Sequence, residues 1–139
     1  MKDLDRNTKQ GLEAEKLVFE KEKGILNSDK RLANFQDRLR HVFREDGDGD
    51  GYDIISCEYD EKTNEVIDRY VEVKSTRHDK NSPFYLTENE LNVAKKEGKL
   101  YHIYRLYKND DDNWDYYVID DVYKNIQCKP IKYRAIPKN

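Results

Sequence analysis

The stretch YVEVKST at residues 70–76 decides the fold class, and its charged residues stand in an unusual place. Tyrosine and valine favour strands, and successive side chains of a strand point to opposite faces. Glu72 and Lys74 therefore share one face, while Val71 and Val73 share the other. Charges in the middle of a half-buried strand are rare unless they are paired or bind a metal. Two interpretations stay open at this point, a salt bridge across strands and a functional site.

The preceding strand predicts a hairpin that brings a third charge to this pair. Residues 52–59, YDIISCEY, are rich in strand formers, and residues 61–64 supply a turn before a strand at 65–75. Early residues of one antiparallel strand pair with late residues of the next. We therefore expect Asp53 to lie close to Glu72.

Further helices and strands are expected on both sides of this hairpin. Before the hairpin we expect a frayed segment 1–7, a helix at 8–23 that ends at Gly24, a short helix within 27–37 and a strand at 39–44. After it we expect a helix from the cap Thr87 to about Lys96 or Glu97 and strands at 100–107 and 114–119. A tail at 124–139 is expected to lie across the sheet or trail off. Thr87 and Glu90 form a capping box, so a structural role for Glu90 is favoured over a chemical one.

A glutamate in the first predicted helix is a fourth candidate for a site. A helical projection places Leu12, Ala14, Val18 and Phe19 on one apolar arc, and Glu15 falls inside it. A carboxylate in an apolar stripe costs stability unless it has a partner. The sequence leaves two interpretations open: a stripe boundary that is off by one position, and a carboxylate that points into a site.

Length and composition set limits on the kind of protein. With 139 residues the chain is expected to be a single domain, residues 1–139, with one core. Its 26 basic and 29 acidic residues give a formal net charge of −3, so binding to nucleic acid requires a local basic patch. Cys57 and Cys128 form no disulfide framework, and no apolar run is long enough for a membrane span. A cytoplasmic protein is therefore expected.

The acidic run EDGDGDG at residues 45–51 invites comparison with a calcium loop. Asp46, Asp48 and Asp50 match the opening of an EF-hand, but Cys57 stands where the loop requires glutamate. The flanking segments also read as strands instead of helices. We therefore interpret the run as a tight acidic turn, and adventitious cation binding by the turn stays open.

Five segments together resemble a known family. GLEAEKLVFE, GYDI, YVEVKST, PFYLTENELNVA and YRLY occur in this order over residues 8–120. Asp53 followed by Glu72-Val73-Lys74 resembles the D…ExK motif of the PD-(D/E)xK nuclease superfamily, and the five segments resemble its NO VEIN C-terminal nuclease-like family. The resemblance implies an α/β protein of the α+β type with a restriction-endonuclease-like core. This core would be a mixed sheet of about five strands flanked by an N-terminal helix and a helix after the E-x-K strand.

The resemblance also implies residue roles. The implied catalytic residues are Asp53, Glu72, Lys74 and Glu15, and the implied metal ligands are Asp53, Glu72 and the carbonyl of Val73. The implied cofactor is Mg²⁺, with Mn²⁺ as a substitute, because magnesium commonly takes one or two carboxylates and fills its shell with water and phosphate. Lys74 would orient or deprotonate the attacking water, or stabilise the transition state.

The implied activity is hydrolysis of DNA phosphodiester bonds by an endonuclease with a role in restriction or defence, and RNA stays open as a substrate. The alternative is an inactive nuclease-fold module that binds nucleic acid or a protein partner, which the net negative charge favours. Similar domains often accompany larger restriction, helicase or ATPase modules, so a partner of that kind is implied. A homodimer is also left open, and no membrane association is expected.

Substrate contacts are expected directly after the E-x-K motif. The candidates are Ser75, Thr76, Arg77 and Lys80. We interpret Lys95, Lys96 and Lys99 on the following helix as a solvated face in preference to a set of phosphate contacts. Residues 121–139 lie outside the resemblance and form a C-terminal tail.

Overall fold

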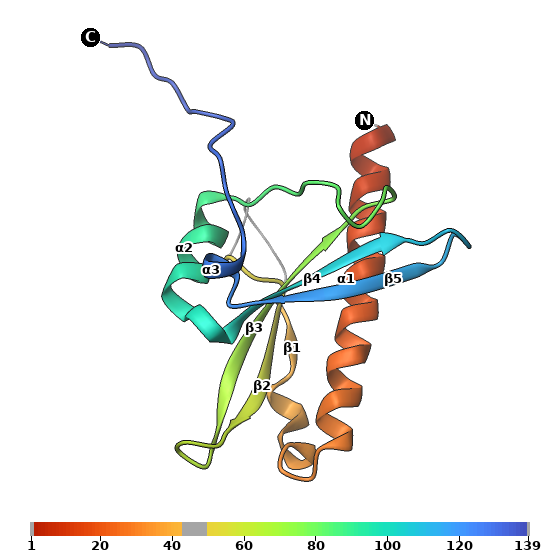
Figure 1. Cartoon of the computed structure of the whole chain (residues 1–139), viewed down its shortest axis with the longest axis vertical. Helices are drawn as coiled ribbons and strands as arrows, with labels where there is room; N and C mark the ends of the chain where they lie inside the picture. The colour runs from red at the N-terminus through yellow and green to blue at the C-terminus, as the bar shows by residue number, and fades with distance from the viewer. Residues whose placement is uncertain (1, 43–49, 139) are drawn as a thin grey trace.

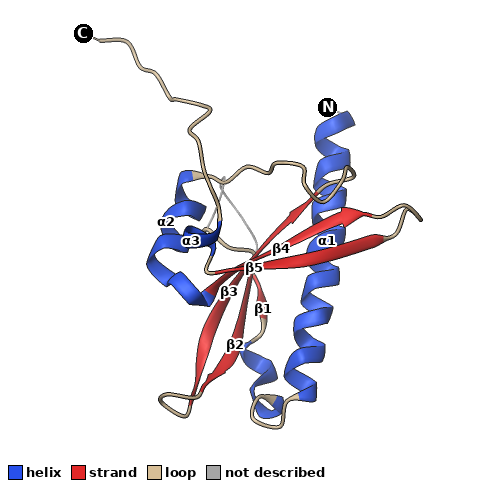
Figure 2. Cartoon of the chain, in the orientation of Figure 1, coloured by secondary structure: helices blue, strands red, loops and turns tan. Residues whose placement is uncertain are grey.

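A five-stranded sheet in the order β1-β2-β3-β4-β5 organises the chain (Figure 1). The computed structural model describes residues 2–42 and 50–138, with side chains from residue 9 onward. The elements are α1 (Lys2–Ser28), the 3₁₀ helix η1 (Ala33–Arg38), β1 (Arg40–His41), β2 (Ile54–Asp60), β3 (Glu65–Ser75), α2 (Glu88–Glu97), the 3₁₀ helix η2 (Gly98–Leu100), β4 (Tyr101–Lys108), β5 (Trp114–Asp120) and α3 (Val122–Asn125) (Figure 2).

The sheet is mixed because one of its four strand pairs is parallel. β3 and β4 run parallel, whereas the pairs β1–β2, β2–β3 and β4–β5 are antiparallel. A parallel pair needs a long crossover connection, and here the crossover contains α2. The expected α+β fold with a mixed sheet of five strands and flanking helices is confirmed, and it is compatible with a restriction-endonuclease-like core.

The helices α1 and α2 cover opposite faces of the sheet (Figure 1). Val71 packs in one core cluster with Val18 and Leu26 of α1. Tyr70, its neighbour in β3, packs in the other cluster with Ala94 of α2. Because side chains alternate along a strand, Glu72 and Lys74 lie on the same side as Tyr70. The charged face of β3 therefore looks toward α2.

α1 is longer than the sequence predicted. It runs from Lys2 to Ser28, whereas the expected helix began at residue 8 and ended at Gly24. Glycine inside a helix costs about 1 kcal/mol relative to alanine. Leu26, beyond the glycine, is fully buried, and burial of a leucine contributes about 1.5–3 kcal/mol. The packing of the last turn therefore outweighs the cost of Gly24.

The buried stripe of α1 also differs from the predicted arc. Ala14, Val18, Glu22 and Leu26, spaced by four residues, are buried. Leu12, which was expected on the apolar arc, is 45% exposed. The stripe therefore contains a glutamate, but this glutamate is Glu22, which contacts Arg69 and Tyr104 on the face of the sheet that α1 covers.

The remaining predictions differ in detail from the structure. β3 and the capped helix α2 are as expected, including the capping box of Thr87 and Glu90. Of the segment 39–44 the structure describes residues 39–42, in which Arg40–His41 form a strand, and the short helix within 27–37 is a 3₁₀ helix at Ala33–Arg38. Most of the acidic run, residues 45–49, lies outside the described residues, as do the first two aspartates of the EF-hand comparison. None of the described helices has the length and apolar character of a membrane span.

Gly51 fits closely between the sheet and α2 and is two residues before Asp53 in the chain. Its φ is +86°, a conformation that favours glycine. A Cβ added there would lie 2.8 Å from Cγ2 of Val93 and 3.2 Å from the carbonyl oxygen of Asn89. The hydroxyl of Tyr101 donates a hydrogen bond to the carbonyl oxygen of Gly51 at 2.8 Å. The approach to Asp53 is therefore fixed by close packing against α2.

We expect Gly51→Ala to lower the free energy of unfolding by about 1–3 kcal/mol, because the added methyl group meets backbone and the φ is strained. Gly24→Ala is the matched control, since a Cβ there meets no atom within 4 Å and alanine favours the helix. Urea denaturation measures both. Equal stability of Gly51→Ala and the wild type would show that close packing at Gly51 is not required.

Candidate active site

Asp53, Glu72 and Lys74 meet at adjacent positions of β2 and β3. Asp53 immediately precedes β2, and its Oδ2 accepts a hydrogen bond from the backbone N–H of Val73 at 2.8 Å. Asp53 and Glu72 are both buried. The Nζ of Lys74 lies 3.5 Å from Oε2 of Glu72. The predicted convergence across the hairpin is therefore confirmed.

A fourth side chain, that of Glu90 in α2, joins this group. Oε1 of Glu90 lies 2.9 Å from Nζ of Lys74 and accepts the N–H of Thr87 at 3.0 Å. The hydroxyl of Thr87 in turn accepts the N–H of Glu90 at 3.1 Å, which completes the capping box. The prediction of a capping role is confirmed, but the same carboxylate also positions Lys74. The capping-box pattern in a sequence does not tell a glutamate that only caps its helix from one that also positions a lysine.

The carboxyl of Glu72 is held in a setting that disfavours its charge. Burial raises its pKa well above the usual value of 4.5, and the nearby charge of Asp53 and the hydrogen bond with Glu90 raise it further. The ammonium of Lys74 opposes this shift without cancelling it. Two carboxylates that repel each other in a buried place are an arrangement that a bound cation would relieve.

Glu90 has the opposite tendency. Burial on its own raises its pKa, but hydrogen bonds from Glu72, from the Thr87 backbone and from Lys74, together with the charge of Lys74, lower the pKa of Glu90 below its usual value. Of the two carboxyl groups, Glu90 thus favours its charged form and Glu72 disfavours it. Pairs of carboxyl groups whose pKa values are pushed apart are frequent at functional sites.

The donor chemistry of the site fits a magnesium ion with a mostly aqueous shell. Asp53 and Glu72 supply two carboxylates, and Mg²⁺ in proteins commonly takes one or two. Within residues 9–42 and 50–138 no group of three or more histidine, cysteine or acidic side chains is arranged to hold a metal. A site that relied on protein ligands alone is therefore not formed by these residues, whereas a two-carboxylate site remains compatible with them.

Glu15 contacts His41 of β1. Its Oε1 lies 2.6 Å from Nε2 of His41, and both side chains are about one-fifth exposed. His41 pairs with Ile54, which packs in the core cluster of α1, so the Glu15–His41 pair lies on the face of the sheet that α1 covers, whereas Glu72 and Lys74 face α2. The structure therefore gives Glu15 the partner that a carboxylate in an apolar stripe needs, but places it apart from the predicted catalytic group. His41 is a partner of Glu15 that sequence reasoning did not identify.

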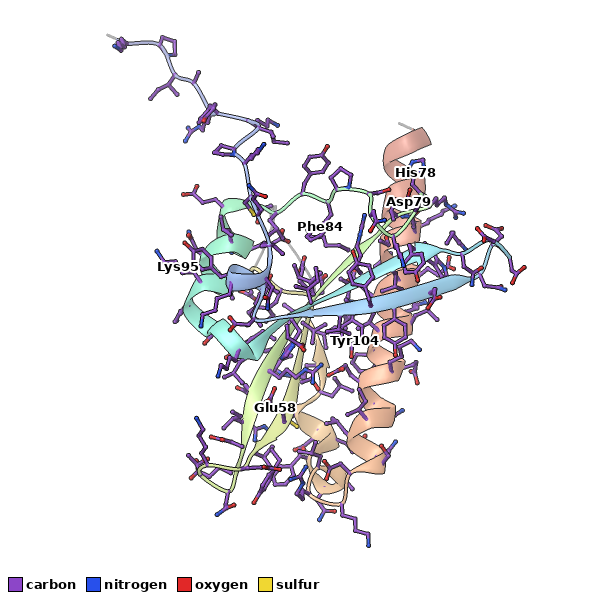
Figure 3. The ribbon with its side chains drawn as sticks, in the orientation of Figure 1. Glu58, His78, Asp79, Phe84, Lys95 and Tyr104 are labelled. Carbon is purple, nitrogen blue, oxygen red and sulfur yellow. The ribbon has the colours of Figure 1, made fainter. Side chains whose placement is uncertain are left out.

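Ser75 and Thr76 line a hollow of about 310 Å³ beside Lys74. Its other walls come from the loop after β3 and from β4, namely Pro83, Phe84, Tyr85 and Arg105. Figure 3 shows Phe84 in the loop that leads from β3 to α2. Arg77 and Lys80, the other two predicted substrate contacts, are exposed in the same loop. Of the four predicted contacts, the structure therefore brings Ser75 and Thr76 to the hollow.

Arg105 is a second residue that sequence reasoning missed. It pairs with Lys74 in the parallel register and is almost fully buried. One of its terminal nitrogens donates to the carbonyl oxygen of Ser82 at 3.1 Å, and its guanidinium lies 5.1 Å from the ring centre of Phe84. Burial lowers the pKa of Arg105. Arg105 is a charged residue in the otherwise apolar strand LYHIYRLY, as Glu72 and Lys74 are in YVEVKST. This pattern could have identified Arg105 from the sequence.

A larger hollow, of about 500 Å³, contains none of the predicted site residues. It is lined by Glu58, Arg69, Lys99, His102, Asp120 and Asp121. His102 Nδ1 lies 2.6 Å from Asp120, and its Nε2 lies 3.7 Å from Glu58. His102 thus pairs with two acidic residues of the lining, while Arg69 pairs with Glu22 outside it. The site at Asp53, Glu72 and Lys74, with its buried carboxylates, is therefore the better candidate for chemistry.

We expect Glu72→Gln to stabilise the protein increasingly as the pH rises. Because the pKa of Glu72 is raised by folding, its stabilising contribution is complete below about pH 4.5 and is lost as the pH rises through the folded pKa. Glutamine stays neutral, so between about pH 4.5 and the folded pKa the variant gains about 1.4 kcal/mol over the wild type for each pH unit. Urea denaturation from about pH 4.5 upward measures the difference in the free energy of unfolding between the variant and the wild type. Exposed Glu65→Gln is the control. A difference between Glu72→Gln and the wild type that does not change with pH would contradict the raised pKa.

We expect Glu90→Gln to lower the free energy of unfolding by about 1–3 kcal/mol, because Lys74 loses its closest carboxylate in a buried place. Glu88→Gln is the matched control, since Glu88 is exposed in the same first turn of α2 and should change stability by no more than about 0.5 kcal/mol. Urea unfolding at neutral pH compares them. Equal effects of the two changes would mean that Glu90 acts on the helix terminus alone.

Comparison with known proteins gives one family. The family described as "Protein NO VEIN, C-terminal" matches residues 14–119, which is more than half of the chain. The match includes the four residues of the site, Asp53, Glu72, Lys74 and Glu90. No curated protein and no solved structure matches the chain. The chain therefore belongs to the NO VEIN C-terminal family, as its ordered segments predicted.

Proposed function

We propose that this protein is a Mg²⁺-dependent nuclease that hydrolyses phosphodiester bonds of DNA. The observation that supports it best is the convergence of Asp53 and Glu72, two buried carboxylates, with the ammonium of Lys74. Hydrolysis of a phosphodiester needs stabilisation of the charge that develops on the phosphate and a source of hydroxide near neutral pH. Two carboxylates and one lysine at a single point supply groups for both tasks.

Each residue of the site has a distinct task in this proposal. Asp53 and Glu72 would hold the cation, which when bound polarises the phosphate and lowers the pKa of a bound water. Lys74 donates hydrogen bonds to the phosphate or to the attacking water. Glu90 fixes Nζ of Lys74 at 2.9 Å, so the lysine is already oriented before substrate binds.

The hollow beside Lys74 supplies a place for the substrate strand. Ser75 and Thr76 line it, with the hydroxyl oxygen of Ser75 accepting from Nε2 of Gln10 and that of Thr76 from the N–H of His78, and Tyr85 in the lining is largely exposed. Hydroxyl groups commonly contact phosphate oxygens, and an exposed aromatic ring can stack on a base. Arg105, which also lines the hollow, holds the loop through the carbonyl oxygens of Ser82 and Pro83. We therefore assign Arg105 a positioning role.

We expect Lys74→Ala to lower the rate of plasmid nicking in Mg²⁺ or Mn²⁺ by about 10²–10³-fold, because one charged donor to the transition state is lost. Binding of the cation, measured by calorimetry, should persist because Asp53 and Glu72 remain. Lys16→Ala is the matched control, since Lys16 is exposed on α1 and its loss should leave the rate unchanged.

The same assay on single-stranded RNA tests the nature of the substrate. If the wild type cuts neither nucleic acid and binds no divalent cation, the proposed hydrolysis is wrong, and the module would act by binding alone. Cleavage by Lys74→Ala at the rate of the wild type would also contradict the proposal, because it would place the chemistry elsewhere.

A further inference from the structure

An extended segment at residues 127–138, here called the arm, leaves the folded body after α3. Figure 1 shows it projecting away from the sheet and helices. All of its residues are exposed, and they form no helix or strand. Ile131, Tyr133 and Ile136 are 72%, 81% and 73% exposed. The arm therefore presents its side chains to solvent instead of to the core.

The charge of the arm is opposite to that of the body. It carries Lys129, Lys132, Arg134 and Lys138 and has no acidic residue. The formal net charge of the whole chain is −3, so the removal of these four positive charges leaves −7 for residues 1–126. An acidic body repels a polyanion, whereas a separate basic segment attracts one.

The arm begins on the face of the sheet that carries the candidate active site. Ile126, the residue before it, packs in the core cluster of α2 together with Phe84 and Leu86 of the loop after β3. Phe84 also lines the hollow beside Lys74. Twelve extended residues span about 40 Å. The arm can therefore follow a duplex outward from the site over roughly one helical turn.

We propose that the arm binds the phosphate backbone of duplex DNA and holds it at the site, an inference that rests on the proposed function. The four basic side chains neutralise backbone phosphates without reading the sequence. This contact offsets the repulsion between the acidic body and its substrate. The exposed Ile131 and Ile136 are not needed for such binding, whereas docking to a protein partner would use them.

The test measures binding of a short fluorescent duplex at several salt concentrations, without divalent cations so that no cleavage occurs. In the arm variant, Lys129, Lys132, Arg134 and Lys138 are all changed to glutamine. The slope of log affinity against log salt should fall by about 3–4. Between about 50 and 200 mM salt, the wild type then loses affinity by about 100-fold more than the variant does.

The matched control changes four exposed lysines outside the arm to glutamine, namely Lys16, Lys23, Lys30 and Lys62. It alters the net charge equally and should lower the slope much less. An arm variant with the slope of the wild type would overturn the proposal. So would a loss of DNA binding in Ile131→Ser with Ile136→Ser that the charge variant does not share, because apolar docking would then be the cause.

These experiments distinguish a failure of the arm proposal from a failure of the proposed hydrolysis. If the wild type shows the arm-dependent slope but does not cut DNA in Mg²⁺, the proposed hydrolysis is wrong and the arm proposal stands. If it cuts DNA and the arm variant keeps the slope, the arm proposal is wrong and the hydrolysis stands.

Discussion

The contact between Lys74 and Glu90 joins the parts of the molecule on which the candidate site depends. The 2.9 Å contact links the strand β3 to the first turn of α2, and the same carboxylate oxygen accepts the N–H of Thr87 at the helix cap. Glu90 also takes a hydrogen bond from Glu72, so Glu72, Lys74 and Glu90 form one connected group. A buried charge is tolerated only with partners. The start of α2 and the orientation of Lys74 are thus determined together.

The hairpin, the capped helix and the D…ExK group could be predicted from the sequence because each depends on short-range rules. Alternation along β3 placed Glu72 and Lys74 on one face, and antiparallel register brought Asp53 to them. The end of α1 could not be predicted in this way, because the burial of Leu26 overrides the local preference of Gly24. Arg105 carries a local signal, a charge in an apolar strand, but its place beside Lys74 could not be predicted, because pairing across a crossover is not a local property.

The charges of this protein are divided between an acidic body and a basic arm, and the division matters for function. A net charge of −3, considered only as a total, disfavours the binding of a polyanionic substrate. The structure separates residues 127–138, which carry only positive charges, from the rest (Figure 1). Electrostatic attraction over a Debye length depends on local charge more than on the total. The proposed substrate contact and the proposed chemistry can therefore occur in different parts of one small chain.

Localisation of a bound cation tests the central claim most directly. Mn²⁺ broadens the NMR signals of nearby nuclei, so titration of the ¹⁵N-labelled protein shows where the ion binds. We expect the amide signals of Asp53, Glu72 and Val73 to broaden first, and Asp53→Asn to abolish this effect, because the two carboxylates meet there. Broadening confined to the exposed acidic turn at residues 110–112, with none at Asp53 and Glu72, would contradict the assignment of this group as a cation-dependent active site.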